Sequence, residues 1–340
     1  MKVDRKEILS SCKLAFAAVG DGKLLPASDK FIFKDEKVFT YNDVMGVCID
    51  CNVGFEGAVD ADMFIKLMDK FPDEEIDIVL EDEEELILQG KRRKAGMAVF
   101  DEEPQVPEVP RKGYSKLSEG FVGKLQKAAR TCGSDMTNFL FTCVHIAPNV
   151  IEACDGARIY CAGGETGFDK DFLLPGDTAN VLASYEITHV QIKGDWCYFK
   201  LRDFEGVMVL RGTDDDYMSE EKIAEILEMG GGEKVVFPTG LVNMIERAVV
   251  ISGNDYDAKI EIVLKKNRML LKAQKEKGWY QEKKKVKYKG KGIGFGIHPL
   301  FLSEMLEKTK RVVVDSVAGK MKMVTGDEHF VVVLQEGLDD

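Results

Sequence analysis

The stretch FTCVHIAPNVIEACDGARIYCA, residues 141–162, decides the fold because its pattern recurs in two other places. It contains a strand-like run, a polar turn, a second strand-like run, an interruption at Asp155-Gly156 and a third strand-like run. FIFKDEKVFTYNDVMGVCI (31–49) and AKIEIVLKKNRMLLKAQKEKGWYQEK (258–283) follow the same order. A spacing of about 110 residues is too long for a solenoid repeat and suits a domain.

Two stretches without periodicity separate the repeats and are predicted to be linkers. FDEEPQVPEVPRKG (100–113) has three prolines, and MGGGEKVVFP (229–238) has three consecutive glycines, compositions that are typical of connecting segments. A chain of 340 residues also exceeds what one core usually holds. We therefore predict an α+β fold with three tandem domains, residues 1–112, 113–232 and 233–340, each with two helices packed on antiparallel sheet.

Helical periodicity occurs in two windows of each predicted domain. The windows are 4–18, 60–71, 115–130, 177–186, 238–251 and 299–310. Asp177, two residues after Pro175, is a candidate N-cap. Asp155-Gly156 occupies the position that Asn42-Asp43 and residues 275–278 occupy in the other repeats. It is predicted to be a bend or bulge inside a long edge-like strand, and the local residues leave open whether Arg158 behind it marks a binding site.

The formal net charge of −12 argues against a protein that is coated in nucleic acid, because such proteins usually carry a basic excess. The charge is unevenly distributed, since the six helical windows carry a net +1 and the rest of the chain −13. A solvated charged face explains this bias, and so does a surface that the helices share. Lysines at 283, 285, 287 and 289 alternate along a predicted strand, where they protect a sheet edge or provide a further basic surface.

No catalytic or metal-binding pattern is present. The four histidines lie at 145, 189, 298 and 329, without metal-ligand spacing, and there is no phosphate-binding loop, dinucleotide fingerprint or nucleophile elbow. Cys48 and Cys51 have the spacing of a redox or half-zinc motif, but they stand alone and are interpreted as two ordinary strand cysteines. We predict reduced thiols, no cofactor, no metal and a binding or scaffolding protein. No apolar run is long enough for a membrane helix and the N-terminus is charged, so a cytosolic protein is expected.

The order of segments over about two hundred residues resembles one known family. The segments NFLFTCVHI (138–146), VIEACDGARIYCA (150–162) and FLLPGDTANVL (172–182) follow the helix LSEGFVGKLQKAART (117–131). LVNMIERAVVISGNDYDAKIEIVLKKNRMLLKA (241–273), GIGFGIHPLFLSEMLE (292–307), VVVDSVAGKMKMV (312–324) and HFVVVL (329–334) come next. This arrangement is similar to the β subunit of bacterial DNA polymerase III, the β sliding clamp, including the clamps of phages.

The resemblance implies a non-catalytic processivity factor for DNA replication. In that family two chains form a head-to-tail homodimer, a closed ring whose helices line the hole around duplex DNA. A groove accepts short peptides of the polymerase, the clamp loader and other clients. The resemblance thus implies a cytoplasmic protein, in a bacterial cell or encoded by a phage, with no membrane partner. A peptide-binding scaffold with the clamp fold but without DNA encirclement is the alternative.

The resemblance also implies site residues. The helix-face cations expected to approach DNA, with Lys23 in a loop, are Lys6, Lys13, Lys23, Lys66, Lys70, Lys127, Arg130, Arg247 and Lys310. The residues expected to form the peptide groove are Leu140, Cys154, Gly156, Arg158, Ile159, Tyr256, His298, Phe301, Val317, Val331, Val332 and Val333. Val250 and Ile251 are expected at the dimer interface, opposite residues 94–99 of the second chain.

Overall fold

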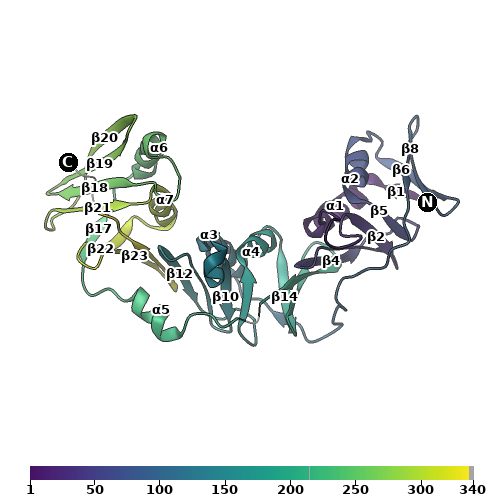
Figure 1. The fold of residues 1–340 in the computed structure, drawn as a ribbon, viewed down its shortest axis with the longest axis horizontal. Coiled ribbons are helices and arrows are strands. Elements are labelled where there is room, and N and C mark those ends of the chain that lie inside the picture. The colour runs from purple at the N-terminus through teal and green to yellow at the C-terminus, as the bar shows by residue number, and fades with distance from the viewer. Residues whose placement is uncertain (214, 337–340) are drawn as a thin grey trace. The chain divides into compact units, whose positions relative to one another are not determined.

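The structure is a computed structural model in which residues 1–213 and 215–336 are described (Figure 1). The chain forms two compact units. Unit 1 comprises Met1–Gln126, Ile146–Pro148 and Glu165–Asp215, and unit 2 comprises Lys127–His145, Asn149–Gly164 and Asp216–Asp340. The predicted division into three domains remains a prediction. The α+β class with antiparallel sheets is confirmed.

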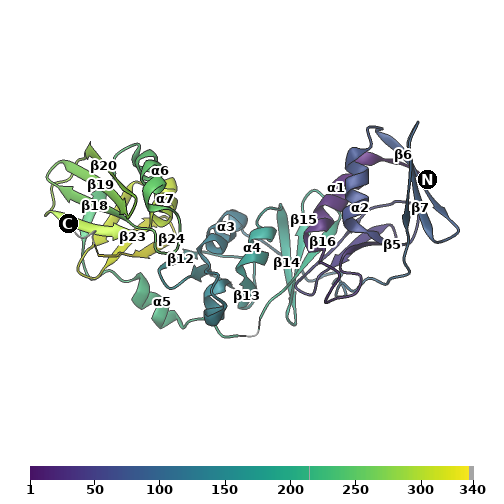
Figure 2. The same cartoon turned by 45° about the horizontal axis from the view of Figure 1, so that its top comes forward.

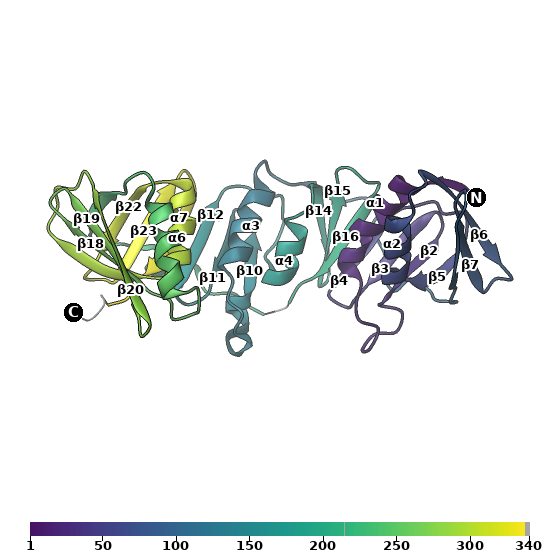
Figure 3. The ribbon, with the colours of Figure 1, turned by 90° about the horizontal axis from the view of Figure 1, so that it is seen from above.

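Unit 1 contains two antiparallel sheets, with strand orders β1-β6-β7-β8 and β5-β2-β3-β4-β16-β15-β14-β9. Its strands are β1 (Lys2–Asp4), β2 (Lys30–Lys34), β3 (Lys37–Tyr41), β4 (Met45–Asp50), β5 (Gly57–Asp60), β6 (Glu75–Glu81), β7 (Glu85–Gln89), β8 (Lys94–Ala98), β9 (Ser115–Lys116), β13 (Phe172–Pro175), β14 (Ile187–Lys193), β15 (Trp196–Leu201) and β16 (Gly206–Arg211). Its helices are α1 (Arg5–Ala15), the 3₁₀ turn η1 (Phe16–Ala18), α2 (Ala61–Lys70) and α4 (Gly176–Leu182). Helices α1 and α2 lie side by side (Figures 2 and 3).

Unit 2 also contains two sheets. In one, the strands β11, β12, β24, β23, β22 and β17 follow one another, and the other has the order β20-β19-β18-β21. The strands are β11 (Val150–Cys154), β12 (Arg158–Gly163), β17 (Glu233–Val236), β18 (Ile260–Lys265), β19 (Arg268–Lys275), β20 (Gly278–Lys285), β21 (Ile293–Ile297), β22 (Arg311–Asp315), β23 (Lys320–Thr325) and β24 (Glu328–Val333). The helices are η2 (Met136–Thr142), α5 (Glu220–Leu227), α6 (Leu241–Ser252) and α7 (Pro299–Lys308), with α6 beside α7 (Figure 3). The chain passes between the units within α3 (Phe121–Thr131) and β10 (Cys143–Ala147).

The three repeats form equivalent antiparallel meanders, β2-β3-β4, β10-β11-β12 and β18-β19-β20. The prediction of a bend inside an edge strand at Asp155-Gly156 was wrong, because these residues form a hairpin turn between two paired strands. The Asp155 carboxylate accepts the backbone N–H groups of Ala157 and Arg158, at 2.9 and 2.8 Å, and Gly156 adopts a φ of 89°. Left-handed backbone suits glycine. Strand β12 lies between β11 and β24, so it is not an edge.

The helices begin where the sequence supplies caps. Asp4 accepts the N–H groups of Lys6 and Glu7 at the start of α1, and Asp60 accepts that of Met63 at the start of α2. Three predicted starts were wrong. Helix α6 begins at Leu241 and not at Pro238, with Gly240 as its N-cap. Helix α3 begins at Phe121, because Ser115 pairs with β14 as part of β9. Helix α4 begins at Gly176 with Pro175 as its N-cap, so Asp177 lies in the first turn, where a carboxylate still complements the helix dipole.

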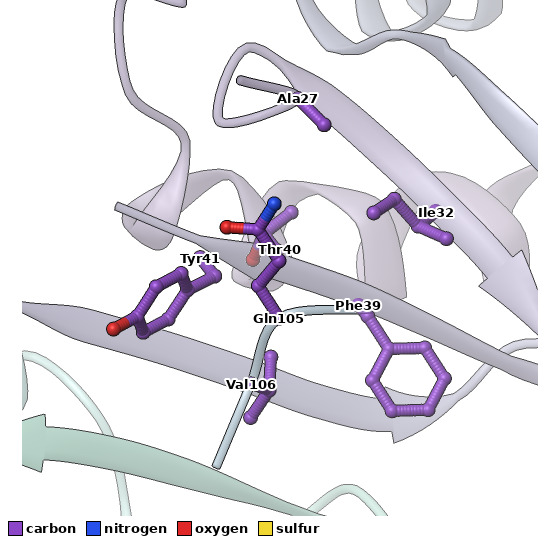
Figure 4. A pocket seen from close by; sticks show the side chains of 7 residues that line it. All are labelled: Ala27, Ile32, Phe39, Thr40, Tyr41, Gln105 and Val106. Atoms are coloured by element: carbon purple, nitrogen blue, oxygen red, sulfur yellow. The ribbon is translucent and has the colours of Figure 1, made fainter. Parts of the chain in front are cut away.

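The predicted linkers are more ordered than their composition indicates. Figure 4 shows Gln105 and Val106 of the first linker beside Phe39, Thr40 and Tyr41 around a cavity of about 10 Å³. That volume holds at most about one water molecule. Val106 and Val109 also pack against the cluster that Tyr198, Val207 and Val209 form. Most of the second linker's valine-rich part forms β17, which pairs with β22 because Val235 is buried there.

Candidate functional site

The predicted DNA-facing cations of unit 1 are exposed, but most are paired with carboxylates. Lys70 forms no ion pair within 4 Å in the described part of the chain. The ion pairs are Lys6 with Glu74 at 3.6 Å, Lys13 with Asp69 at 3.0 Å, Lys66 with Asp62 at 2.5 Å and Lys23 with Asp21 at 3.7 Å. Exposed pairs of this kind contribute about 0–1 kcal/mol, so the ammonium groups can leave their partners at little cost.

The predicted DNA-facing cations of unit 2 differ in their hydrogen-bond and ion-pair partners. Arg247 on α6 donates hydrogen bonds to the Tyr280 hydroxyl at 3.0 Å and to Glu282 at 2.7 Å. Lys310 donates to the Thr239 hydroxyl at 3.0 Å. Arg130 is exposed, and no ion pair within 4 Å involves it among the residues that the structure describes. These side chains therefore offer a weakly basic surface.

Lys127, which is also predicted to approach DNA, differs from the other cations because it is paired and only partly exposed. Its ammonium lies 2.5 and 2.6 Å from the two carboxylate oxygens of Glu328, and its side chain is only 25% exposed. The ammonium is also 6.0 Å from the centre of the Tyr160 ring. The charge of Lys127 is thus neutralised within unit 2. The helical wheel placed Lys127 opposite the apolar stripe, but it could not show that β24 brings a carboxylate to it.

Arg158, at the centre of the predicted peptide groove, is buried and holds several elements together. Its guanidinium donates to Asp155 at 2.8 Å, to the Arg130 carbonyl oxygen at 2.6 Å and to the Glu304 carboxylate. It also lies 4.2 Å above the centre of the Phe301 ring. Its hydrogen bonds thus join the β11–β12 turn to α3 and α7. In this structure Arg158 is not available to a peptide.

The alternation of side chains explains why the predicted groove divides between two faces of one sheet. Arg158 and Val332 are paired across β12 and β24, and Arg158 contacts the helices α3 and α7. Ile159 and Val331 are the next pair, and both belong to an apolar cluster with Ile223 of α5. Arg158 and Val332 therefore lie on the face opposite to that of Ile159 and Val331, because neighbouring strand residues point in opposite directions. That all four belong to one peptide groove stays a prediction.

The remaining predicted peptide residues differ in burial. His298 is buried and stacks on the half-buried Phe301, with ring centres 4.4 Å apart. Cys154 belongs to the cluster of Ile159 and Val331. Tyr256 is 94% exposed and Val317 99% exposed. Leu140 is half-buried, whereas Gly156 and Val333 are exposed. Exposed apolar side chains such as Tyr256 and Val317 gain most from a partner.

Sequence reasoning missed the segment that covers Cys154, Ile159 and Val331. Ile223 of α5 is buried in their cluster, and partly buried side chains pack against it: Phe141, Tyr217, Met218, Ile226 and Leu227. A signal for α5 was present. Ser219 is an N-cap whose hydroxyl accepts the Lys222 N–H, and Ile223, Ile226 and Leu227 have helical spacing.

Two histidines of unit 2 are expected to make its stability depend on pH. Burial lowers the pKa of His298 and of His329 below the usual 6.5, and neither Nδ1 atom has a hydrogen-bond partner. The unfolded chain therefore binds more protons as the pH falls, so the contribution to stability is present above about pH 6.5 and is lost below it. Denaturant titrations at pH 7.5 and pH 5.5 should show a smaller loss for the H298N/H329Q double variant than for the wild type. An equal loss in both proteins would contradict this assignment.

The cysteine pair gives no sign of redox or metal chemistry. Burial raises the pKa of Cys48 to about 11, so this thiol is protonated at neutral pH, and Cys51 is also buried. Within residues 1–213 and 215–336, no group of three or more His, Cys, Asp or Glu residues is arranged to hold a metal ion. In the same part of the chain no helix has the length and apolarity needed to cross a bilayer.

Comparison with solved protein structures identifies the fold. No protein-family model matches the sequence, and no curated protein does. Among solved structures, the β subunit of the DNA polymerase of Streptococcus pyogenes is 17% identical with a TM-score of 0.84, and the match covers 98% of this chain and 99% of that one. The DNA polymerase sliding clamp of Bacillus subtilis is 12% identical with a TM-score of 0.84 over 99% of both chains. The sliding clamp of Pseudomonas aeruginosa bound to griselimycin is 15% identical with a TM-score of 0.83 over 99% of both chains. The resemblance seen in the sequence is confirmed for the fold: this chain has the fold of the β subunit of bacterial DNA polymerase III, the β sliding clamp.

Proposed function

We propose that this protein is a sliding clamp, a processivity factor that encircles duplex DNA and tethers a replicative polymerase. The observation that carries the proposal is the fold similarity to sliding clamps over 98–99% of the chain. The weakly basic helix surfaces support it, since firm phosphate contacts would hold DNA at one position and enclosure does not require them. The proposed clamp acts in the cytoplasm of a bacterial cell, as a cellular or phage-encoded protein, and catalyses no reaction itself.

The ring is proposed to be a head-to-tail homodimer in which edge strand β8 of one copy pairs with edge strand β20 of the other. Both strands are unpaired on their outer side in the described sheets. The sheet of β8 is acidic, with residues 81–85 reading EDEEE, whereas β20 ends in three lysines at 283–285. Val250 on neighbouring α6 is 82% exposed and Trp279 on β20 72%. Opposite charge and exposed apolar side chains favour this pairing.

The proposed client site uses the exposed and partly buried apolar side chains of unit 2, with Tyr256, Val317 and Val333 at its open end. Polymerase, clamp loader and other clients would reach it through short peptides. An apolar surface with few polar anchors suits affinities near 1 µM, about −8 kcal/mol, which permit exchange of clients.

Topological retention tests the proposal directly. The protein is incubated with linear plasmid, onto which a closed ring can thread from an end, and the DNA is then circularised by a DNA ligase. The complex is separated by gel filtration in about 0.3 M NaCl and treated with a restriction enzyme that cuts the plasmid once. Screening by this salt weakens phosphate contacts but not enclosure. We expect the protein to stay on the circle and to be released when the circle is opened, with retention at least about tenfold longer before cutting. Equal retention on circular and linear DNA excludes encirclement.

A peptide-binding scaffold with the clamp fold is the second candidate, and the pairing of most predicted cations with carboxylates favours it. The double variant K66E/K70E on α2 separates the two functions, because a clamp should lose retention on circular DNA whereas a scaffold without DNA has none to lose. The matched control K265E/K266E makes the same charge change at the β18–β19 turn. Lys127 is unsuitable for this test, because the K127E change would place a second carboxylate beside that of Glu328.

A further inference from the structure

The sheet β20-β19-β18-β21 of unit 2 has one face that α6 covers and one face that is open to solvent. Glu282 of β20 lies on the covered face, where its carboxylate accepts a hydrogen bond from Arg247 of α6 at 2.7 Å. Side chains alternate along a strand, so Lys283 and Lys285 lie on the open face, and both are exposed. Arg268 of β19 pairs with Lys285 and is exposed on the same face. The open face is therefore basic where β19 and β20 lie side by side.

The exposed cations continue beyond the end of β20. Val286 and Tyr288 are buried, at 6% and 2% exposed, and they alternate with lysines that are exposed. Asn267 in the β18–β19 turn holds this segment in place. Its N–H donates to the Tyr288 carbonyl oxygen at 3.1 Å, and its carbonyl oxygen accepts the Val286 N–H at 3.3 Å. The outer basic stripe is the set of exposed cations Arg268, Lys283, Lys285, Lys287, Lys289 and Lys291.

The chain itself does not neutralise the outer basic stripe. Residues 268–291 contain ten lysine or arginine residues and two glutamates, in a chain whose net charge is −12. None of the six stripe residues forms an ion pair within 4 Å with another residue of 1–213 or 215–336. Glu233 lies beside Gly290, near one end of the stripe. At the other end Arg268 and Lys285 form a directly opposed cross-strand pair, and like charges in such a pair destabilise a sheet. An anion bound across this pair would remove the repulsion.

Protection of a sheet edge explains only part of the outer basic stripe. Strand β20 is an edge strand, where lysines hinder pairing with other sheets. Arg268, however, belongs to β19, which lies between β18 and β20, and Lys287 lies beyond the end of β20. The stripe also stays accessible in the proposed ring. Pairing of β8 with β20 would use backbone groups in the plane of the sheet, whereas the stripe's side chains on β19 and β20 stand perpendicular to that plane.

We propose that the outer basic stripe binds the phosphates of a single-stranded nucleic acid, on the face of the sheet that points away from α6. Lysines at every second residue of a strand are about 7 Å apart, a spacing close to that of successive phosphates along an extended single strand. A duplex presents its phosphates on a stiff, curved surface, so a straight stripe on a sheet meets fewer of them. Contacts to phosphates alone do not depend on base sequence. This site goes beyond the proposed clamp function, which places duplex DNA at the helix surfaces.

Fluorescence anisotropy of a labelled oligothymidylate of about 20 nucleotides tests this proposal. A closed ring slides off so short a linear strand, so the anisotropy reports phosphate contacts and not enclosure. We expect the wild type to bind about fiftyfold more weakly at about 200 mM NaCl than at about 50 mM, the dependence for about four phosphate contacts. The R268Q/K285Q/K287Q variant should bind at least about tenfold more weakly than the wild type at the lower salt concentration, with a smaller salt dependence. The matched control R111Q/K112Q/K116Q removes the same charges from exposed positions of unit 1 and should bind as the wild type does.

Equal binding by the wild type and by R268Q/K285Q/K287Q overturns the proposal. Two further results would overturn it by assigning the stripe to another partner. One is a larger loss of binding to a blunt duplex than to oligothymidylate in this variant, and the other is displacement of oligothymidylate by polyglutamate at equal charge concentration. Binding by the interface variant V250D/W279A but not by the wild type would also overturn it, because the second copy would then cover the stripe.

Urea unfolding shows whether R268Q/K285Q/K287Q is intact. The variant should be at least as stable as the wild type, because it removes the opposition of Arg268 and Lys285. Retention on circular plasmid is measured separately in about 0.3 M NaCl, where phosphate contacts are screened. Loss of retention would therefore count against the proposed clamp and not against the outer basic stripe.

Discussion

The V250D/W279A double variant is expected to be a monomer of 38.0 kDa in solution, whereas the wild type is expected to have twice that mass. Val250 and Trp279 are among the most exposed large apolar side chains of the described chain, at 82% and 72%. Each is next in sequence to a residue of the contact between α6 and β20, which Ile251 and Gly278 form. Large aromatic anchors at interface centres contribute about 2 kcal/mol or more, and an aspartate without a partner there adds a desolvation cost. Together the changes should weaken association by about a thousandfold.

Sedimentation measures this effect across protein concentration, and the plasmid assay measures its consequence. The monomeric variant should lose topological retention, because an open chain cannot enclose DNA. Substituting Val236, which is 49% exposed on β17, with aspartate is the matched control and should leave the mass unchanged. A wild-type protein that is monomeric at about 10 µM would refute the ring, because association weaker than −7 kcal/mol would leave it open at cellular concentrations.

Replacing Arg158 with methionine should destabilise unit 2 by about 3–5 kcal/mol, because it leaves the carboxylates of Asp155 and Glu304 without their partner. The arginine side chain is 6% exposed, and those of the two acids are 13% and 19% exposed. Burial raises the pKa of Glu304 although Arg158 lies against it. The desolvation of this carboxylate therefore exceeds the attraction of the guanidinium, and Glu304 should take up a proton once the arginine is removed.

Urea unfolding that is monitored by tryptophan fluorescence and circular dichroism checks this expectation. The R158M/E304Q double variant should recover part of the loss, because the neutral amide needs no counter-charge. R158K should recover little, since a lysine lacks the planar fork that reaches Asp155, Glu304 and the Arg130 carbonyl together. A loss below about 1 kcal/mol in R158M would mean that the cluster contributes no more than an exposed ion pair.

The local pattern of residues was sufficient to predict the three meanders, most helix positions and the principal helix N-caps. Alternation of apolar residues fixes a strand's buried face, and an aspartate before a helical stripe fixes where the helix begins, as at Asp4 and Asp60. The predictions that were wrong concern segments whose structure depends on pairing with residues far away in the sequence. Ser115 and Lys116 left the predicted helix because β14 offered backbone partners, and the valines of the second linker joined β22 for the same reason.

The sequence by itself determined the α+β class, the threefold repeat and the identity of the residues around the Asp155-Gly156 turn. Only the tertiary structure decided what those residues do. It placed Arg158 and Ile159 on opposite faces of one sheet, paired Lys127 with Glu328 and brought α5 onto Cys154, Ile159 and Val331. The physical reason is that charge and apolar character belong to single residues, whereas burial and pairing depend on segments that lie far apart in the chain. The sequence alone does not distinguish an exposed lysine on a helix from one whose charge is neutralised by a carboxylate on a distant strand.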